Sequence, residues 1–352
     1  MHVVWPQRPS LAPRRDASRR VVHEARTLRR AELTHDLTKE DCALIALGSS
    51  LLRSGYRFTT PTPATHGRVN ARPIQSPASL TDILGWSRPF ADADLPDDLL
   101  VLLMEARAVM PAQSRLRSTV RFSTLGQQIF VHSAYPTEQD DAVFFGPDTY
   151  RFARMLEREL PDLWGRKGLR ILDIGAGSGA GGLHASTLLG RESRPAIVLG
   201  DINEQALRFC RINAAINGVA NVEVLASDLY AGIGGRFDVI MANPPYLVDG
   251  RTRLYRHGGG TLGAAISLAI VEQGIARLRP RGRLLLYTGS AIVDGKDLFL
   301  EALEQSLAGK RVRLCYDEID PDVFGEELEH PPYDQADRIA VVSAVIESLE
   351  AS

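Results

Sequence analysis

The tetrapeptide Asn243–Pro244–Pro245–Tyr246 directly follows FDVIMA, an apolar run that predicts a buried strand. Proline has no N–H for a sheet ladder, so we expect the strand to end at about Ala242. The two prolines stiffen the backbone beyond that point. The tetrapeptide could therefore present two hydrogen-bond acceptors, the Asn243 amide and the Pro244 carbonyl, to a ligand outside the sheet. The alternative is a stiff loop that only turns the chain.

A glycine-rich stretch, DIGAGSGAGG, follows another predicted strand. Gly175, Gly177 and Gly179 allow the backbone to pass close to a ligand, and a helix is expected to begin there. Gly177, Gly179 and Gly182 also satisfy the GxGxxG nucleotide pattern, which alone is a weak signal. A simple strand-to-helix turn is the alternative.

Three carboxylates stand at the ends of successive predicted strands. Asp173 precedes the glycines and could orient the loop or accept from a cationic amine. Asp201 lies 26 residues after Gly175 and could take both hydroxyls of a ribose. Asp228, in ASDLY, could accept from an adenine amino group. Each alone could be an ordinary cap or turn residue, but ligands of α/β sheets bind beyond the carboxyl ends of the strands, and together the three predict such a site.

The elements that must position these residues alternate along the chain from about residue 141. Apolar runs predict strands and helical spacing predicts helices, which implies a mostly parallel sheet with helices on both faces. The expected strands lie at 169–174, 196–201, 222–227, 237–242, 282–289, 310–319 and 338–347, and the expected helices at 203–218 and 262–278.

The order ILDIGAGSG, GD, SDL and NPPY resembles class I S-adenosylmethionine-dependent methyltransferases over about 141–352. It is most similar to the group with an (Asn/Asp)-Pro-Pro-(Tyr/Phe/Trp) motif, which methylates planar amino groups. That group includes HemK-like release-factor glutamine methyltransferases and amino-methylating DNA and RNA enzymes. FFGPDTYRFARML extends the likeness, with Pro147, Asp148 and Thr149 at the entry to a helix. Asp148 or Thr149 is also a credible cap of that helix.

This resemblance implies a Rossmann-like sheet of seven strands, the last antiparallel, with S-adenosyl-L-methionine as the cofactor. Two acceptors would hold the hydrogens of a planar NH2 group and direct its lone pair to the sulfonium methyl, mostly by positioning and without a separate base. Tyr246 would stack on the planar group. The implied catalytic residues are Asn243, Pro244, Pro245 and Tyr246, and the implied cofactor-binding residues are Thr149, Asp173, Gly175, Gly177, Gly179, Asp201, Ile202, Asp228, Leu229 and Asn243.

Residues 38–140 predict a smaller α+β accessory domain. A helix is expected over about 39–53, with Thr38 as its cap and Asp41 three positions on. SLTDILGW and PDDLLVLLMEARAVM predict two further helices, and STVRFSTLGQQIFVHSAY predicts a β-hairpin around Leu125–Gly126. Three helices and a hairpin suggest a winged-helix-like arrangement.

The amino-acid composition argues against several other classes of protein. Of 352 residues, 44% are apolar and 24% charged, as in soluble globular proteins. No run approaches about 20 apolar residues, so no membrane span is expected. Three widely spaced cysteines predict neither a disulfide framework nor a metal site, and a reducing cytoplasm fits best. Residues 1–37 are rich in arginine and are predicted to be a disordered leader, with a transit peptide or a nucleic-acid arm as alternatives.

The acceptor is best interpreted as a protein glutamine side chain, as in a release factor. The alternatives are an amino group of RNA or DNA, or of a small molecule, and a nicotinamide oxidoreductase is less favoured. A net charge of −2 and seven acids over 317–329 disfavour nucleic acid. Against this, Arg251, Arg253 and Arg256, with His257, could form a lid that grips phosphate. The sequence leaves the oligomeric state open.

Overall fold

The computed structural model describes residues 37–73, 77–190, 192–248, 255–260 and 262–350. Residues 37–352 form one compact unit by themselves. The predicted leader falls, except for Leu37, outside the described residues. None of the described helices is long and apolar enough to cross a membrane.

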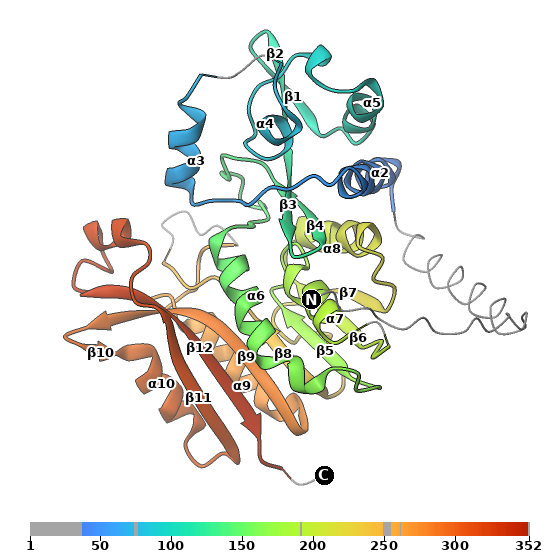
Figure 1. The fold of residues 1–352 in the computed structure, drawn as a ribbon. Coiled ribbons are helices and arrows are strands. Elements are labelled where there is room, and N and C mark those ends of the chain that lie inside the picture. The colour runs from blue at the N-terminus through green and yellow to red at the C-terminus, as the bar shows by residue number, and fades with distance from the viewer. Residues whose placement is uncertain (1–36, 74–76, 191, 249–254, 261, 351–352) are drawn as a thin grey trace, which may run out of the picture. The chain divides into compact units, whose positions relative to one another are not determined.

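A twisted sheet forms the larger part of this unit (Figure 1). Its strand order is β11-β12-β9-β8-β5-β6-β7, with the two-residue β10 paired to β9. The strands β5 to β9 run parallel, whereas β12 runs antiparallel to both β9 and β11. This order confirms the predicted Rossmann-like sheet with its last strand antiparallel. The bounds are β5 Arg170–Ile174, β6 Ala196–Asp201, β7 Val222–Ala226, β8 Phe237–Ala242, β9 Leu278–Val293, β10 Lys296–Asp297, β11 Val312–Asp320 and β12 Arg338–Ser348.

Helices cover both faces of this sheet because its central strands are apolar on both sides. In β8, Val239 and Met241 pack in one core cluster with α6 and α7, whereas Ile240 and Ala242 pack in another with α9 and α10. The bounds are α6 Pro147–Glu159, α7 Ala180–Leu188, α8 Glu204–Ile216, α9 Ala265–Gly274 and α10 Leu298–Leu307. The predicted helices appear within a few residues of their expected bounds, and α10 is an addition.

The smaller part contains the expected helices α2 Lys39–Arg53, α4 Leu80–Leu84 and α5 Asp97–Glu105, and the expected hairpin of β3 Val120–Leu125 and β4 Gln128–Ser133. Thr38 and Asp41 make the predicted capping box. The expected third helix is too long, because α5 ends before Arg107, which has φ 51°, and the chain then forms a hairpin. That hairpin, β1 Val109–Ala112 and β2 Arg115–Ser118, and α3 Pro63–Asn70 are not predicted from the sequence.

The smaller part shares a hydrophobic core with the helix α8. Phe209, Ile212 and Ile216 of α8 lie in the same cluster as Leu44 and Leu47 of α2. The boundary near residue 140 therefore stays a prediction about domains, and in this structure apolar contacts cross it. Short 3-10 turns at Asp92–Asp94, Pro161–Leu163, Ile275–Arg277 and Gly325–Glu329 complete the described elements.

Candidate active site

The sheet register brings the predicted ligand segments to one edge. Ile174, the last residue of β5, pairs with Gly200 of β6 and with Ala242 of β8. The glycine loop, Asp201 and Asn243 therefore leave the sheet next to one another. The strand order reverses between β5 and β8, and such a switch point opens a crevice at the carboxyl ends of the strands.

The glycine loop after β5 has the conformation and the open space that a close ligand requires. Gly175 and Gly177 have φ of 67° and 55°, and a Cβ on either would meet nothing within 4 Å. Gly179 differs, although it too has positive φ. It begins α7, and a Cβ there would approach Leu199 and Cys210 in the core. Gly179 is absent from the cavity wall, and its role here is to let the loop enter the helix.

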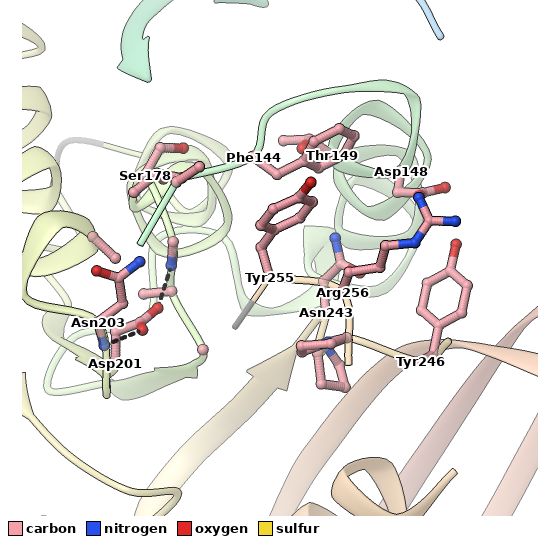
Figure 2. A pocket seen from close by; sticks show the side chains of 18 of the residues that line it. Phe144, Asp148, Thr149, Ser178, Asp201, Asn203, Asn243, Tyr246, Tyr255 and Arg256 are labelled. Atoms are coloured by element: carbon pink, nitrogen blue, oxygen red, sulfur yellow. Dashed lines mark hydrogen bonds between the residues drawn. The ribbon is translucent and has the colours of Figure 1, made fainter. Parts of the chain in front are cut away.

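Asp201 ties the end of β6 to the glycine loop. Its Oδ2 accepts from the Gly177 N–H at 2.8 Å and its Oδ1 accepts from the Asn203 N–H at 2.9 Å, as Figure 2 shows. Burial raises the pKa of this carboxyl, and the backbone N–H groups partly oppose the rise. Asn203 in turn begins α8 as its N-cap. The exposed Ile202 follows Asp201 and lies on the cavity wall.

Asp173 is a buried carboxyl beneath the same loop. Its Oδ2 accepts from the Gly182 N–H at 2.7 Å. Burial raises its pKa to about 7, with a smaller contribution from the nearby Asp201 charge. Asp173 can therefore orient the loop and, when ionised, attract a cationic group of a ligand. Asp228, by contrast, is exposed at the rim, where it lines the cavity beside Leu229.

One cavity of about 650 Å³ joins these residues to the Asn-Pro-Pro-Tyr tetrapeptide, hereafter the bracket. Every predicted site residue except Gly179 lies on its wall. Figure 2 shows its two ends, with Asp201, Asn203 and Ser178 at the glycine-loop end and Tyr246, Arg256 and Asp148 at the bracket end. The predicted residues on the wall are Thr149, Asp173, Gly175, Gly177, Asp201, Ile202, Asp228, Leu229, Asn243, Pro244, Pro245 and Tyr246.

The bracket is held by the chain segment that follows it. The strand β8 ends at Ala242, as expected from the prolines. Gly258 donates its N–H to the Leu247 carbonyl oxygen at 2.7 Å. A Cβ on Gly258 would come within 2.7 Å of the Pro245 carbonyl oxygen, and one on Gly263 within 2.2 Å of the Tyr246 carbonyl oxygen. Glycine is therefore required at both positions to let the following loop pack against the bracket.

The helix entry before β5 differs from its prediction. The N-cap of α6 is Gly146, and neither Asp148 nor Thr149 takes that position. Thr149 sits one turn further on, where its Oγ1 accepts from the Gly146 N–H at 3.3 Å. Pro147 explains the difference. Proline is favoured at the first helical position, so the cap is the residue directly before it, Gly146.

Asp148 does not cap the helix and instead lies buried in the cavity wall. Its Oδ1 accepts from the Tyr287 hydroxyl at 2.9 Å and from Arg151 at 3.2 Å. Arg151 also pairs with Asp320 at 2.8 Å. The bracket end thus carries a buried carboxylate whose position in the wall the sequence does not indicate.

Aromatic residues from two distant segments form another part of the wall missed by sequence reasoning. The rings of Phe144 and Tyr255 lie parallel, with centroids 5.8 Å apart. The Tyr255 hydroxyl donates to the Thr137 carbonyl oxygen at 2.9 Å. Residues 135–138, which follow the accessory hairpin, also line the cavity. The aromatic side chains were visible in the sequence, but no local pattern placed them at this site.

The predicted arginine lid is only partly described. Arg251 and Arg253 lie outside the described residues, whereas Arg256 and His257 line the cavity. Arg256 forms an ion pair with Glu327, which belongs to the acidic run over 317–329. The acids of that run are therefore partly neutralised by arginines, as the pair of Arg151 with Asp320 also shows.

Residues 151–306 match the model of the Methyltransferase small domain family. A release factor glutamine methyltransferase of Deinococcus radiodurans is 31% identical over 168 residues, which are 45% of this chain and 55% of that protein. A ribosomal RNA small subunit methyltransferase C of Serratia proteamaculans is 30% identical over 116 residues, 28% of this chain and 32% of that protein. A solved structure of a T. thermophilus 16S rRNA N2 G1207 methyltransferase with AdoMet and guanosine has a TM-score of 0.43 at 19% identity, and the match covers 70% of this chain and 61% of that one.

The predicted resemblance to class I S-adenosylmethionine-dependent methyltransferases is confirmed by the family match and these relatives. Residues 151–306 are thus similar to a methyltransferase domain, and the similarity supports S-adenosylmethionine as the cofactor. The chain spans about half the length of the first of these curated relatives and about a third of the second.

Proposed function

We propose that this protein transfers a methyl group from S-adenosylmethionine to the side-chain amide nitrogen of a protein glutamine. The observation that carries the proposal is the single cavity that joins the glycine loop to the bracket. A cofactor at one end and an amino group at the other would meet inside it. The proposed setting is the cytoplasm, with a protein such as a release factor as the partner.

The residues at the glycine-loop end fit this cofactor. Open space above Gly175 and Gly177 leaves room for a close ligand. The carboxylate of Asp201 has lone pairs to accept from ribose hydroxyls, and Asp173, when ionised, suits a cationic ammonium. Ile202, with 58% of its surface exposed, offers an apolar contact to a planar ring. S-adenosylmethionine, when bound, supplies an electrophilic methyl on a sulfonium sulfur.

The bracket then acts on the acceptor nitrogen. The Asn243 side-chain oxygen and the Pro244 carbonyl oxygen accept the two N–H bonds of the acceptor, which fixes the direction of its lone pair. The new N–C bond forms as the methyl leaves sulfur, and the surplus proton departs from nitrogen afterwards. Positioning of this kind lowers the barrier without a separate base.

The charge around the bracket end supports a protein acceptor. Glu138 and Asp148 lie on the wall, and the two nearby arginines are paired with carboxylates, Arg151 with Asp148 and Arg256 with Glu327. A nucleic acid would bring phosphates toward these carboxylates, which is unfavourable. The second candidate acceptor is an amino group of an RNA base, because one group of relatives is named for ribosomal RNA.

The test is methylation of purified release factor beside ribosomal RNA and DNA across a salt series. Label in the release factor glutamine, with weak salt dependence, supports the proposal. Label only in nucleic acid, with a steep loss of affinity as salt rises, overturns the glutamine assignment and favours the base amino group.

A further inference from the structure

The hydroxyl of Tyr246 is buried without a partner. Tyr246 is 7% exposed, and its Oη has no hydrogen bond to any described residue. Within the described part of the chain four other buried side-chain atoms share this state, but none of them belongs to a residue of the cavity wall. The unpaired hydroxyl therefore belongs to a residue that lines the cavity at its proposed acceptor end.

The ring of Tyr246 is fixed in place. A Cβ on Gly289 of β9 would lie 2.3 Å from the ring, so the ring packs directly on that strand. Tyr287 and Phe324 meet it at steep angles, with centroid distances of 6.5 and 6.0 Å. Contacts on several sides leave little room for the hydroxyl to turn toward another partner.

The hydroxyl of the neighbouring Tyr287, unlike that of Tyr246, has a hydrogen-bond partner. It donates to Asp148 Oδ1 at 2.9 Å, and Arg151 donates to the same oxygen. Figure 2 shows the Tyr246 side chain extending toward Asp148 and Arg256. Burial raises the pKa of Tyr246 well above its ordinary value, and the charge of Asp148 and a loose polar contact with it add to the rise. Tyr246 therefore stays protonated and remains a donor at neutral pH.

Leaving a donor of this kind unpaired is costly, at about 1–3 kcal/mol in a buried position. A ligand or a bound water that accepts from the hydroxyl would remove this cost. In a primary carboxamide, a carbonyl oxygen is bonded to the same carbon as the reacting nitrogen. An acceptor whose NH2 group lies on Asn243 and Pro244 would bring that oxygen to the bracket end as well.

We infer that the Tyr246 hydroxyl donates to the carbonyl oxygen of the acceptor carboxamide and so helps to select it. This inference rests on the proposed function. Tyr246 would then recognise the acceptor through its hydroxyl as well as through the face of its ring. A site that hydrogen-bonds a polar group of its substrate strongly rejects analogues that lack this group, because the partner in the protein is then left unpaired.

The test compares Tyr246→Phe with Tyr287→Phe in the full chain. For Tyr246→Phe we expect kcat/KM on release factor to fall about tenfold to hundredfold. Its affinity for S-adenosylhomocysteine should be unchanged, and the Tm of the ligand-free protein should be equal or higher, because an unpaired buried hydroxyl has been removed. Tyr287→Phe removes a paired hydroxyl and should lower the Tm.

Two results would overturn the inference. One is full activity of Tyr246→Phe on the acceptor that the wild-type protein methylates. The other is a Tm loss equal to that of Tyr287→Phe, which would show that Asp148 already holds the Tyr246 hydroxyl. A wild-type protein that does not methylate release factor would instead contradict the proposed function, and the Tm comparison would still report on the hydroxyl.

Discussion

Asn213 of α8 completes the hydrogen bonding of Val131 on the edge of the accessory hairpin. Its Oδ1 accepts from the Val131 N–H at 2.8 Å, and its Nδ2 donates to the Val131 carbonyl oxygen at 3.0 Å. One helical turn later, Asn217 makes the same pair of bonds with Ile129, at 3.1 and 2.8 Å. Two side-chain amides four residues apart thus take the place of a neighbouring strand along β4.

Asn213→Ala should therefore destabilise the whole described unit. The substitution leaves the Val131 N–H and carbonyl without this partner in a buried position, at about 1–3 kcal/mol for each group. We expect urea unfolding to show a loss of at least about 2 kcal/mol in a single transition. The control is Gln335→Ala, an exposed amide, which should change little. Unfolding in two separate steps would indicate that the hairpin and the methyltransferase part are independent.

Asp201→Ala should weaken cofactor binding and also loosen the glycine loop. The carboxylate accepts from the backbone of Gly177 and Asn203 before any ligand binds. Hydrogen bonds to a charged group contribute about 1.5–3 kcal/mol each, so we expect S-adenosylhomocysteine affinity to fall at least about tenfold by calorimetry. Glu304→Ala serves as the control, because that carboxylate is exposed and lies outside the cavity wall. An unchanged affinity in Asp201→Ala would remove Asp201 from the site.

The buried carboxyl of Asp173 should give the protein a pH dependence near neutrality. Its folded pKa of about 7 lies above its ordinary 3.8, so the folded state binds this proton more tightly than the unfolded state. The contribution of Asp173 to ligand-free stability is therefore present below about pH 4 and is lost as pH rises to about 7. Affinity for the cationic cofactor should change in the opposite direction and increase through the same range.

Asp173→Asn tests this sign, because an amide oxygen can still accept from the Gly182 N–H. In the variant, the stability loss between about pH 4 and 7 should shrink, and cofactor affinity should be lower and nearly independent of pH. A wild-type stability that rises over this window, with no difference from the variant, would contradict the assignment.

A thermal shift should separate the methyltransferase from a nicotinamide enzyme. A ligand at one hundred times its Kd stabilises the folded state by about 2.7 kcal/mol. We expect S-adenosylhomocysteine to raise the Tm and a nicotinamide dinucleotide to leave it unchanged. Stabilisation by the dinucleotide alone would favour the oxidoreductase alternative.

The sequence predicts those parts of the fold and site that local signals determine. The prolines end β8 at Ala242, and Gly175 and Gly177 after β5 take open, positive-φ conformations that let a ligand approach, as expected. The cap of α6 was predicted wrongly, because Thr149 and Asp148 compete with Gly146 and Pro147 within four residues. Parallel pairing then explains why residues far apart in the chain share one edge.

The residues that sequence reasoning missed reach the cavity only through tertiary packing. Tyr255 and Phe144 are more than a hundred positions apart, yet their rings lie parallel. Asp148 faces the cavity because Tyr287 and Arg151 hold it there. No spacing or periodicity in the chain encodes these contacts, so a sequence pattern could not have indicated them.

The most direct test of the account measures two properties of Asn243→Ala in the full chain: methyl transfer to its acceptor, and affinity for S-adenosylhomocysteine. Because Asn243 is proposed to act mainly on the acceptor nitrogen in the transition state, we predict that the methyl-transfer rate falls on the order of 10² or more, with cofactor affinity nearly intact. Near-normal turnover would contradict the account, because the bracket would then not be catalytic.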